Sequence, residues 1–342
     1  MASPAVRINK VAEKSNVAVF GTDTSAGRIF LDILGKSSFP IENLFPVVSA
    51  TEDEYDAVRF REKTRMVEEI ADFDFSQVKF AFFMTDQTVV RQFAPKAMKQ
   101  GALVIDNSGL YDDDNDYPLI VPEINGSELD LEDKLWASPN SVAIEVSLVL
   151  SELMKEFGAV RADAVSLEAV SSDGQVGLNE LVRQSASLLN GVPSESRHFR
   201  GQVAFNVISE IGDRADGGRT EHERLVIRQT EALLPDLEDK FSIYSLRVPV
   251  FYGHSVVLTY TPEKKTSVSE IEKVLSGSQV LKYEQEELVT PASHGVSREM
   301  PFVSRVVSNG DSYTMFIVMD NTMKGEALNC LQIGEALTKL LS

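Results

Sequence analysis

The first 140 residues alternate short apolar runs with amphipathic segments, and this alternation constrains the fold more than any other feature of the sequence. The first apolar run ends at Gly21, and the segment after it places Ile29, Ile33 and Leu34 at helical spacing. Further segments of both kinds follow, namely apolar runs at residues 44–50, 79–84 and 102–105 and a helical stretch at residues 88–100. Strands that alternate with helices are typical of a doubly wound parallel sheet. The sequence therefore predicts an α/β chain that begins with a Rossmann-like domain.

The pattern changes at Ser141, where a long amphipathic helix leads into a mixture of strands and helices. Strands are expected at residues 162–170, 241–250, 255–260, 301–308 and 313–319, and helices at residues 142–157, 176–190, 221–234 and 268–275. Residues 141–321 are therefore predicted to form a second, mixed α+β domain. A last helix, residues 324–341, is expected to return to the first domain, which would then comprise residues 1–140 and 322–342.

The composition excludes several classes of partner and site. The 342 residues contain 33 basic and 52 acidic side chains, and a net charge of −19 disfavours attraction to nucleic acid or to an anionic membrane. A single cysteine excludes a disulfide framework and a thiolate metal cage, so no metal site is expected. Residues 1–15 lack the apolar centre of a signal peptide, and the longest apolar stretch, residues 142–154, is interrupted by polar side chains. We therefore expect a cytoplasmic protein.

The segment Gly21-Thr-Asp-Thr-Ser-Ala-Gly27 lies where a nucleotide-binding turn is expected, between the first strand and the first helix. Glycines at such a turn let the backbone approach a pyrophosphate, which then rests on the amides of the helix N-terminus, here near Ser25 and Ala26. Thr24 occupies the middle position, where a Cβ at positive φ would cost about 1 kcal/mol, and Asp23 adds a negative charge. Two interpretations stay open: a weak dinucleotide site, or a purely structural turn.

Glu52 and Asp53 follow the second apolar run, about where an acidic side chain meets a ribose hydroxyl in dinucleotide-binding folds. No lysine or arginine stands beside them to favour a 2′-phosphate. If a dinucleotide binds, the sequence favours NAD over NADP.

Several segments together carry a resemblance to a known family. They are Val104-Ile-Asp-Asn-Ser-Gly109, Pro118-Leu-Ile-Val-Pro-Glu-Ile-Asn125, Ala204-Phe-Asn-Val-Ile208, Arg247-Val-Pro-Val-Phe-Tyr-Gly-His-Ser255 and Asp320-Asn321 with Lys324-Gly-Glu-Ala-Leu-Asn329. Over nearly its whole length the chain resembles the aspartate-semialdehyde dehydrogenase family, and its differences from that family are similar to those of the Usg proteins, a group of dehydrogenase-like paralogues. The resemblance implies a homodimer, with the dimer interface in the second domain.

The family's enzymes reversibly reduce aspartyl phosphate to the semialdehyde with NADPH, and the resemblance implies which residues would take part here. The cysteine nucleophile falls on Ser141, preceded by Asn140 beside the substrate, and the site glutamine falls on Glu168. The substrate arginine and the catalytic histidine are matched by Arg247 and His254. The remaining correspondences place Asp112 and Leu225 at two basic phosphate-binding positions, Ser172-Asp-Gly174 at a glycine-alanine-glycine turn, and Asn321 at the cofactor.

These differences set three functional hypotheses against one another. The leading one is a homologue without dehydrogenase activity, which retains weak binding of a nucleotide or a small carboxylate. It rests on the loss of the thiol and on Glu168 and Asp112, since two like charges 4 Å apart repel by about 4 kcal/mol at an effective dielectric of 20. The second is an active NAD(P)-dependent semialdehyde dehydrogenase of amino-acid biosynthesis with altered chemistry. The third is a serine hydrolase that uses Ser141, His254 and Glu168.

Several side chains also have structural interpretations. Ser141 is expected merely to cap its helix. Arg247 either pairs with Glu168, with His254 bonded to the backbone, or binds a small carboxylate near His254. Cys330 is expected to be a core residue. The other histidines, His198, His222 and His294, are expected at the surface, and residues 111–116 form a predicted solvated loop.

Overall fold

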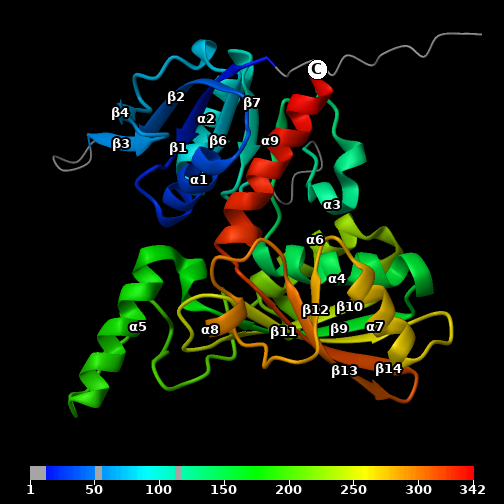
Figure 1. Ribbon diagram of the computed structural model, residues 1–342. Coiled ribbons are helices and arrows are strands. Elements are labelled where there is room, and N and C mark those ends of the chain that lie inside the picture. The colour runs from blue at the N-terminus through cyan, green and yellow to red at the C-terminus, as the bar shows by residue number, and fades with distance from the viewer. Residues whose placement is uncertain (1–12, 51–55, 112–116) are drawn as a thin grey trace, which may run out of the picture.

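The computed structural model describes residues 13–50, 56–111 and 117–342, and it contains two six-stranded sheets (Figure 1). The first sheet has the order β5-β2-β1-β6-β7-β8, and every neighbouring pair in it is parallel. Its strands are β1 (Ser15–Phe20), β2 (Ile41–Val48), β5 (Glu68–Glu69), β6 (Phe80–Phe83), β7 (Leu103–Asp106) and β8 (Leu135–Ala137). The parallel order confirms the predicted Rossmann-like architecture.

Helices cover both faces of this sheet because its strands are apolar on both sides. Phe80 and Phe82 of β6 pack in one core cluster with α1 (Ser25–Lys36) and with α9 (Asn329–Leu340), the last helix of the chain. Phe83, on the opposite face, shares a cluster with α2 (Gln87–Lys99). The C-terminal helix α9 therefore belongs to the same layered unit as the first sheet. In Figure 1, α9 runs from beside the second sheet along the first sheet to the C-terminus.

The second sheet is mixed and has the order β10-β9-β11-β14-β13-β12. Its strands are β9 (Arg161–Glu168), β10 (Phe241–Arg247), β11 (His254–Thr261), β12 (Lys282–Glu284), β13 (Phe302–Asn309) and β14 (Ser312–Met319). Strands β9 and β10 alternate buried side chains with more exposed ones, as expected for a sheet with one covered face. The covered face packs against α4 (Ser141–Phe157), α6 (Glu221–Leu233) and α7 (Val268–Gly277).

The other face of the second sheet carries a row of apolar side chains. Val257 is the register partner of both Val165 and Phe316, and Val165 is the partner of Tyr244. Tyr244 is 52% exposed, and Val165 and Val257 are each more than one-third exposed. The core-forming helices α4 and α6 lie on the opposite side of the sheet (Figure 1). This row is called the outer apolar row below.

The structure adds elements that the sequence pattern did not predict. They are β5, β8, β12, a hairpin of β3 (Ala57–Phe60) and β4 (Lys63–Met66), and the short helices α3 (Pro122–Asn125) and α8 (Pro291–His294). Helix α5 (Gly174–Leu189) corresponds to a predicted helix but begins two residues earlier. The last predicted helix is divided, because residues Met323–Leu328 form a π-helix before α9 starts.

The predictions for Glu52, Asp53, Asp112 and most of the loop 111–116 fall outside the described residues. In the described part of the chain, no helix is both long and apolar enough to cross a membrane.

Candidate active site

Three of the predicted site residues lie at one edge of the second sheet. Glu168 ends β9 and is the register partner of Arg247, which ends β10, and His254 begins β11. The backbone of Ala169 connects two of them, because its N–H donates to Nδ1 of His254 at 3.1 Å and its carbonyl accepts from Nη1 of Arg247 at 2.7 Å. All three residues are at most 5% exposed. The sheet edge therefore forms a buried polar cluster.

Ser141 is the first residue of α4 and is 7% exposed. A Cβ added to Gly325 would lie 2.4 Å from the Cβ of Ser141 and 3.3 Å from Cε of Met319, which is the register partner of His254. Ser141 thus lies beside the same sheet edge. The helix is capped by Asn140, whose Oδ1 accepts the N–H of Val142 at 2.9 Å. The prediction that Ser141 caps the helix is therefore wrong, and the predicted substrate residue Asn140 has its carbonyl oxygen engaged in capping.

The hydrogen bond to His254 defines its protonation state. Burial lowers the pKa of His254 to about 4, so the ring is neutral at pH 7. Because Nδ1 accepts the N–H of Ala169, the proton of the neutral ring is on Nε2, and Nε2 has no partner among the described residues. A base for Ser141 would need a free ring lone pair, and in this tautomer the lone pair is already used. His254 is therefore a hydrogen-bond donor in this arrangement.

Glu168 pairs with a histidine that the sequence analysis placed at the surface. Its Oε1 lies 2.8 Å from Nε2 of His222 and accepts the hydroxyl of Ser166 at 2.8 Å. Burial favours a raised pKa for Glu168, but the charge and hydrogen bond of His222, with His254 and Arg247 nearby, hold it well below the usual range. Burial likewise opposes charge on His222, and Glu168 overcomes this and raises the pKa of His222. The two side chains form a buried hydrogen-bonded pair that favours the protonated ring of His222 and the ionised carboxylate of Glu168.

The partners of Glu168 exclude the geometry of a catalytic triad. In a triad the acid orients the base by accepting from its Nδ1–H. Here Glu168 is bonded to His222, and Nδ1 of His254 accepts from the backbone. The serine hydrolase hypothesis thus lacks both the free base and the acid that would orient it.

Arg247 is paired with Asp173, and the predicted pair with Glu168 does not form. Its Nη2 lies 2.6 Å from Oδ2 of Asp173, and Nη1 donates to the carbonyl of Ala169 and to the hydroxyl of Ser172. The guanidinium side chain is 6% exposed. The positive charge that the resemblance assigns to a substrate carboxylate is therefore neutralised by a carboxylate of the same chain.

Glu145 is a further acid of this region that the sequence analysis missed. It lies one helical turn after Ser141 in α4 and is 0% exposed, and neither carboxyl oxygen has a hydrogen-bond partner among the described residues. Burial, with a smaller contribution from the charge of Glu168, raises its pKa well above the ordinary value. Burial therefore favours the protonated form of Glu145.

The glycine turn adopts an unstrained geometry. Thr24 has φ −79° and ψ 164°, and its hydroxyl accepts the N–H of Gly27 at 2.9 Å as the N-cap of α1. The predicted obstruction by a positive φ at Thr24 is thus wrong, because the middle position is an extended cap residue. Gly21 has φ +83°, and a Cβ on Gly27 would lie 2.0 Å from the carbonyl oxygen of Gly21. Both glycines are required for the close approach of the turn to the helix.

Asn321 has a structural role in this conformation. Its Oδ1 accepts the N–H of Gly253 at 3.1 Å, and its Nδ2 donates to Ser171 at 3.0 Å. These bonds fix the segment that leads into His254. Both polar ends of the side chain predicted to bind a cofactor are therefore engaged by the protein.

Of the remaining predictions for single side chains, those for His198 and Cys330 are confirmed and that for His294 is wrong. His198 is exposed, as predicted. His294 is 5% exposed and packs edge-on against Phe302, so its surface prediction is wrong. Cys330 is 0% exposed within the first core, as predicted, and its Sγ lies 3.6 Å from Oδ1 of Asn107.

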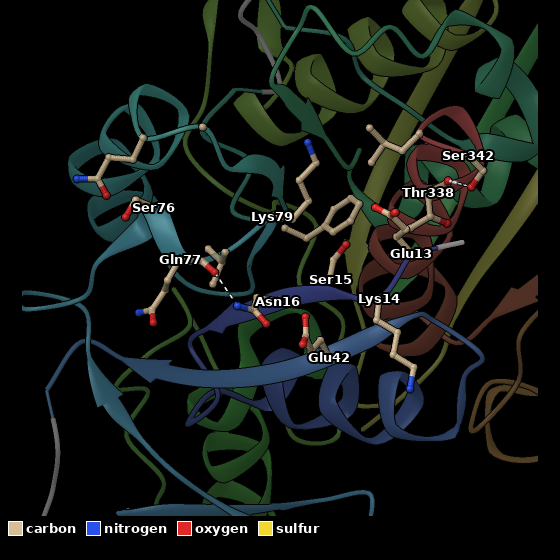
Figure 2. A pocket seen from close by; sticks show the side chains of 15 residues that line it. Glu13, Lys14, Ser15, Asn16, Glu42, Ser76, Gln77, Lys79, Thr338 and Ser342 are labelled. Atoms are coloured by element: carbon tan, nitrogen blue, oxygen red, sulfur yellow. Dashed lines mark hydrogen bonds between the residues drawn. The ribbon is translucent and has the colours of Figure 1, made fainter. Parts of the chain in front are cut away.

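A cavity of about 870 Å³ lies at the opposite end of the first sheet from the glycine turn (Figure 2). Ser15 and Phe80 line it where β1 and β6 begin, and Ser342 lines it at the end of the chain. Ligands of open parallel sheets bind at the carboxyl ends of the strands. This cavity is therefore not the candidate nucleotide site.

Comparison with known proteins identifies the family. Residues 16–132 match the model of the NAD binding domain of semialdehyde dehydrogenases, and residues 150–324 match the model of their dimerisation domain. The aspartate-semialdehyde dehydrogenase of Shewanella violacea is 31% identical over 337 residues, which cover 96% of this chain and 99% of the relative. The chain belongs to the aspartate-semialdehyde dehydrogenase family.

Solved structures of family members have the same fold. The crystal structure of aspartate semialdehyde dehydrogenase II from Vibrio cholerae, complexed with ASA, superimposes with a TM-score of 0.91 at 30% identity and covers 96% of this chain and 99% of that one. A probable aspartate-semialdehyde dehydrogenase from Pseudomonas aeruginosa superimposes with a TM-score of 0.90 at 30% identity and covers 96% and 100% of the two chains. The two sheets thus correspond to the family's NAD-binding and dimerisation domains.

Proposed function

We propose that this protein is a Usg-type member of the aspartate-semialdehyde dehydrogenase family that does not catalyse the phosphorylating dehydrogenase reaction. The observation that carries the proposal is the state of the nucleophile position. Ser141 stands at the N-terminus of α4, and the ring lone pair of His254 is held by the N–H of Ala169.

A thiol and a hydroxyl differ decisively at this position. The N-terminus of a helix favours an anion, and it lowers the pKa of a cysteine thiol far enough for a thiolate to form near pH 7. A serine hydroxyl stays protonated there and needs a base within hydrogen-bond reach. His254 does not supply that base in the observed tautomer, so Ser141 remains a neutral hydroxyl.

The charges around the site support the same proposal. An acyl phosphate substrate brings two or more negative charges, and Glu168 is held ionised beside Arg247 and His222. Arg247 already has Asp173 as its counterion. A phosphorylated dianion would therefore enter a region whose cations are already neutralised.

The glycine turn fits a dinucleotide, and we propose that weak binding is retained. The amides of Ser25 and Ala26, at the start of α1, have no hydrogen-bond partner among the described residues, as an anion site at a helix N-terminus requires. A bound nicotinamide cofactor would supply hydride transfer at this end of the sheet. Asp23 is exposed beside these amides and opposes a pyrophosphate, so we expect weak affinity and NAD bound no worse than NADP.

We further propose that the protein is a cytoplasmic homodimer whose subunits pair through the outer apolar row. The dimerisation-domain match covers the strands that carry this row. An exposed contiguous apolar patch on a sheet marks an interaction surface, and a twofold axis would pair the row with itself.

The proposed function is tested by following NADP reduction at the nicotinamide absorbance with aspartate semialdehyde and phosphate. A family member with its cysteine serves as the positive control under identical conditions. We expect no reduction above the rate without protein. An enzyme that is active with altered chemistry would instead reduce or oxidise the nicotinamide in the presence of a semialdehyde.

A further inference from the structure

We propose that Asp173 is a tethered carboxylate that occupies the anion site formed by Arg247 and His198, and so excludes small free carboxylates from it. This inference rests on the proposed function, because it explains how a family member without turnover keeps a buried arginine. It adds a residue and a mode of control that the family assignment does not include.

The guanidinium of Arg247 and the imidazole ring of His198 both contact the carboxylate of Asp173. Oδ2 lies 2.6 Å from Nη2 of Arg247, and Oδ1 lies 3.1 Å from Nε2 of His198. The centre of the Phe199 ring lies 5.7 Å from the guanidinium carbon of Arg247. A carboxylate bound between an arginine and an imidazole is the arrangement that a free carboxylate ligand would adopt.

The position of Asp173 in its own helix makes this pairing informative. Asp173 is the N-cap residue of the 16-residue helix α5, and aspartate is among the preferred N-cap residues. Nevertheless its side chain makes no capping hydrogen bond. The carboxylate is thus withdrawn from the helix end and directed to Arg247.

A cavity borders the same group of side chains. Its volume is about 240 Å³, and its charged or titratable lining residues are His198, Arg200 and Arg247 with the acids Asp173, Glu210 and Asp213. Glu210 and Asp213 pair with Arg200, so Asp173 is the acid that faces Arg247. The space adjoins the ion pair, so displacement of the Asp173 side chain would open Arg247 to a small ligand. The Arg247 side chain is only 6% exposed, and a buried guanidinium needs a counterion. A free carboxylate can supply that charge only when Asp173 does not.

The chemical class of ligand follows from the geometry. The site presents a planar guanidinium fork and one imidazole, which suit a single carboxylate group of a small aliphatic acid. A tethered group competes at an effective concentration in the millimolar range or above. Free carboxylates in the unmodified protein are therefore expected to bind only at high concentration.

The test is titration of the full chain with succinate, followed by isothermal calorimetry and by thermal unfolding. Asp173→Asn removes the tethered charge, and we expect its dissociation constant for succinate to be at least tenfold lower than that of the unmodified protein. Asp173→Glu keeps a carboxylate and should remain as weak as the unmodified protein. The matched control is Asp163→Asn, which breaks an exposed aspartate–arginine pair in the same domain and should leave succinate binding unchanged.

Two further samples keep the test decisive. Asp173→Ser also removes the charge and supplies a good N-cap for α5, so it replaces the asparagine variant if that variant does not unfold cooperatively. Arg247→Lys added to either neutral variant should abolish the gain, because the lysine lacks the bidentate fork. The inference is overturned if a folded neutral variant binds succinate no more tightly than the unmodified protein, or if the gain survives Arg247→Lys. NADP reduction by the unmodified protein would overturn the proposed function alone, since the titration involves no turnover.

Discussion

Nε2 of His222 lies 2.8 Å from Oε1 of Glu168, inside the second domain where each side chain is largely or fully removed from solvent. The pair accounts for a carboxylate at the end of β9 that would otherwise be strongly destabilised by burial. Glu168 is therefore bonded to His222 and not to His254, whose Nδ1 accepts the backbone N–H of Ala169. Glu168, which stands at the family's glutamine position, is therefore stabilised by hydrogen bonds to His222 and Ser166 of the same chain.

The raised pKa of Glu145 gives a testable pH dependence. Its pKa is raised in the folded protein, so the unfolded chain ionises first and stability falls as the pH rises above about 4.5. Glu145→Gln removes this titration. The quantity to measure by urea unfolding is the free energy of unfolding of the variant minus that of the unmodified protein. We expect this difference to be larger at pH 8 than at pH 5. Identical pH slopes for the two proteins would contradict the assignment.

The glycine turn packs tightly against the start of α1, so one methyl group added at Gly27 should lower the stability of the fold. Gly27→Ala places a Cβ 2.0 Å from the carbonyl oxygen of Gly21, and overpacking of this kind costs about 1–3 kcal/mol. The control is Gly277→Ala at the end of α7, where a Cβ has no neighbour within 4 Å. That variant should be neutral or stabilised by up to about 1 kcal/mol. Equal thermal stability of the two variants would show that the turn is not tightly packed.

The outer apolar row predicts how the dimer can be broken. Val257→Lys places a charge in the centre of the row, opposite Val165 and Phe316. A twofold interface would bring two such charges together, so we expect the variant to sediment as a 37.7 kDa monomer at micromolar concentration, whereas the unmodified protein sediments as a dimer. A monomeric unmodified protein would contradict the proposed assembly.

Restoring the nucleophile alone is predicted to be insufficient. Ser141→Cys, made in a Cys330→Ala background, should react with iodoacetamide, because the helix N-terminus favours the thiolate. It should still give no NADP reduction, because Glu168 and the Asp173–Arg247 pair remain. Turnover should need Asp112→Arg, Glu168→Gln and Leu225→Lys as well, with strongly non-additive effects. Robust semialdehyde-dependent activity of the single variant would refute the importance of the pocket charges.

Sequence patterns predicted the architecture well because the two sheets depend on hydrophobic periodicity. The short strands β8 and β12 were missed because each has only three residues. The strain expected at Thr24 was wrong, since a residue's φ is set by its place as a helix cap and cannot be read from its position between two glycines.

The site was predictable where it followed the family's motifs and unpredictable where this chain differs from them. His222 had a signal that was overlooked: it shares one helical face with Val226, Gln229 and Leu233, all buried in α6. Asp173 gave no such signal, because its partner Arg247 lies 74 residues later and the contact depends on how η3 (Val170–Asp173) turns back toward the end of β10. Tertiary contacts of this kind follow from packing, not from local sequence.

The most direct test of the account is the activity of the unmodified protein itself. The purified chain is mixed with aspartate semialdehyde, phosphate and NADP, and absorbance at the nicotinamide band is followed over a range of pH. We predict no protein-dependent NADP reduction at any pH, because His254 does not act as a base for Ser141 and Arg247 has a resident carboxylate. Saturable reduction that depends on both the semialdehyde and phosphate would contradict the proposal that this family member lacks dehydrogenase activity.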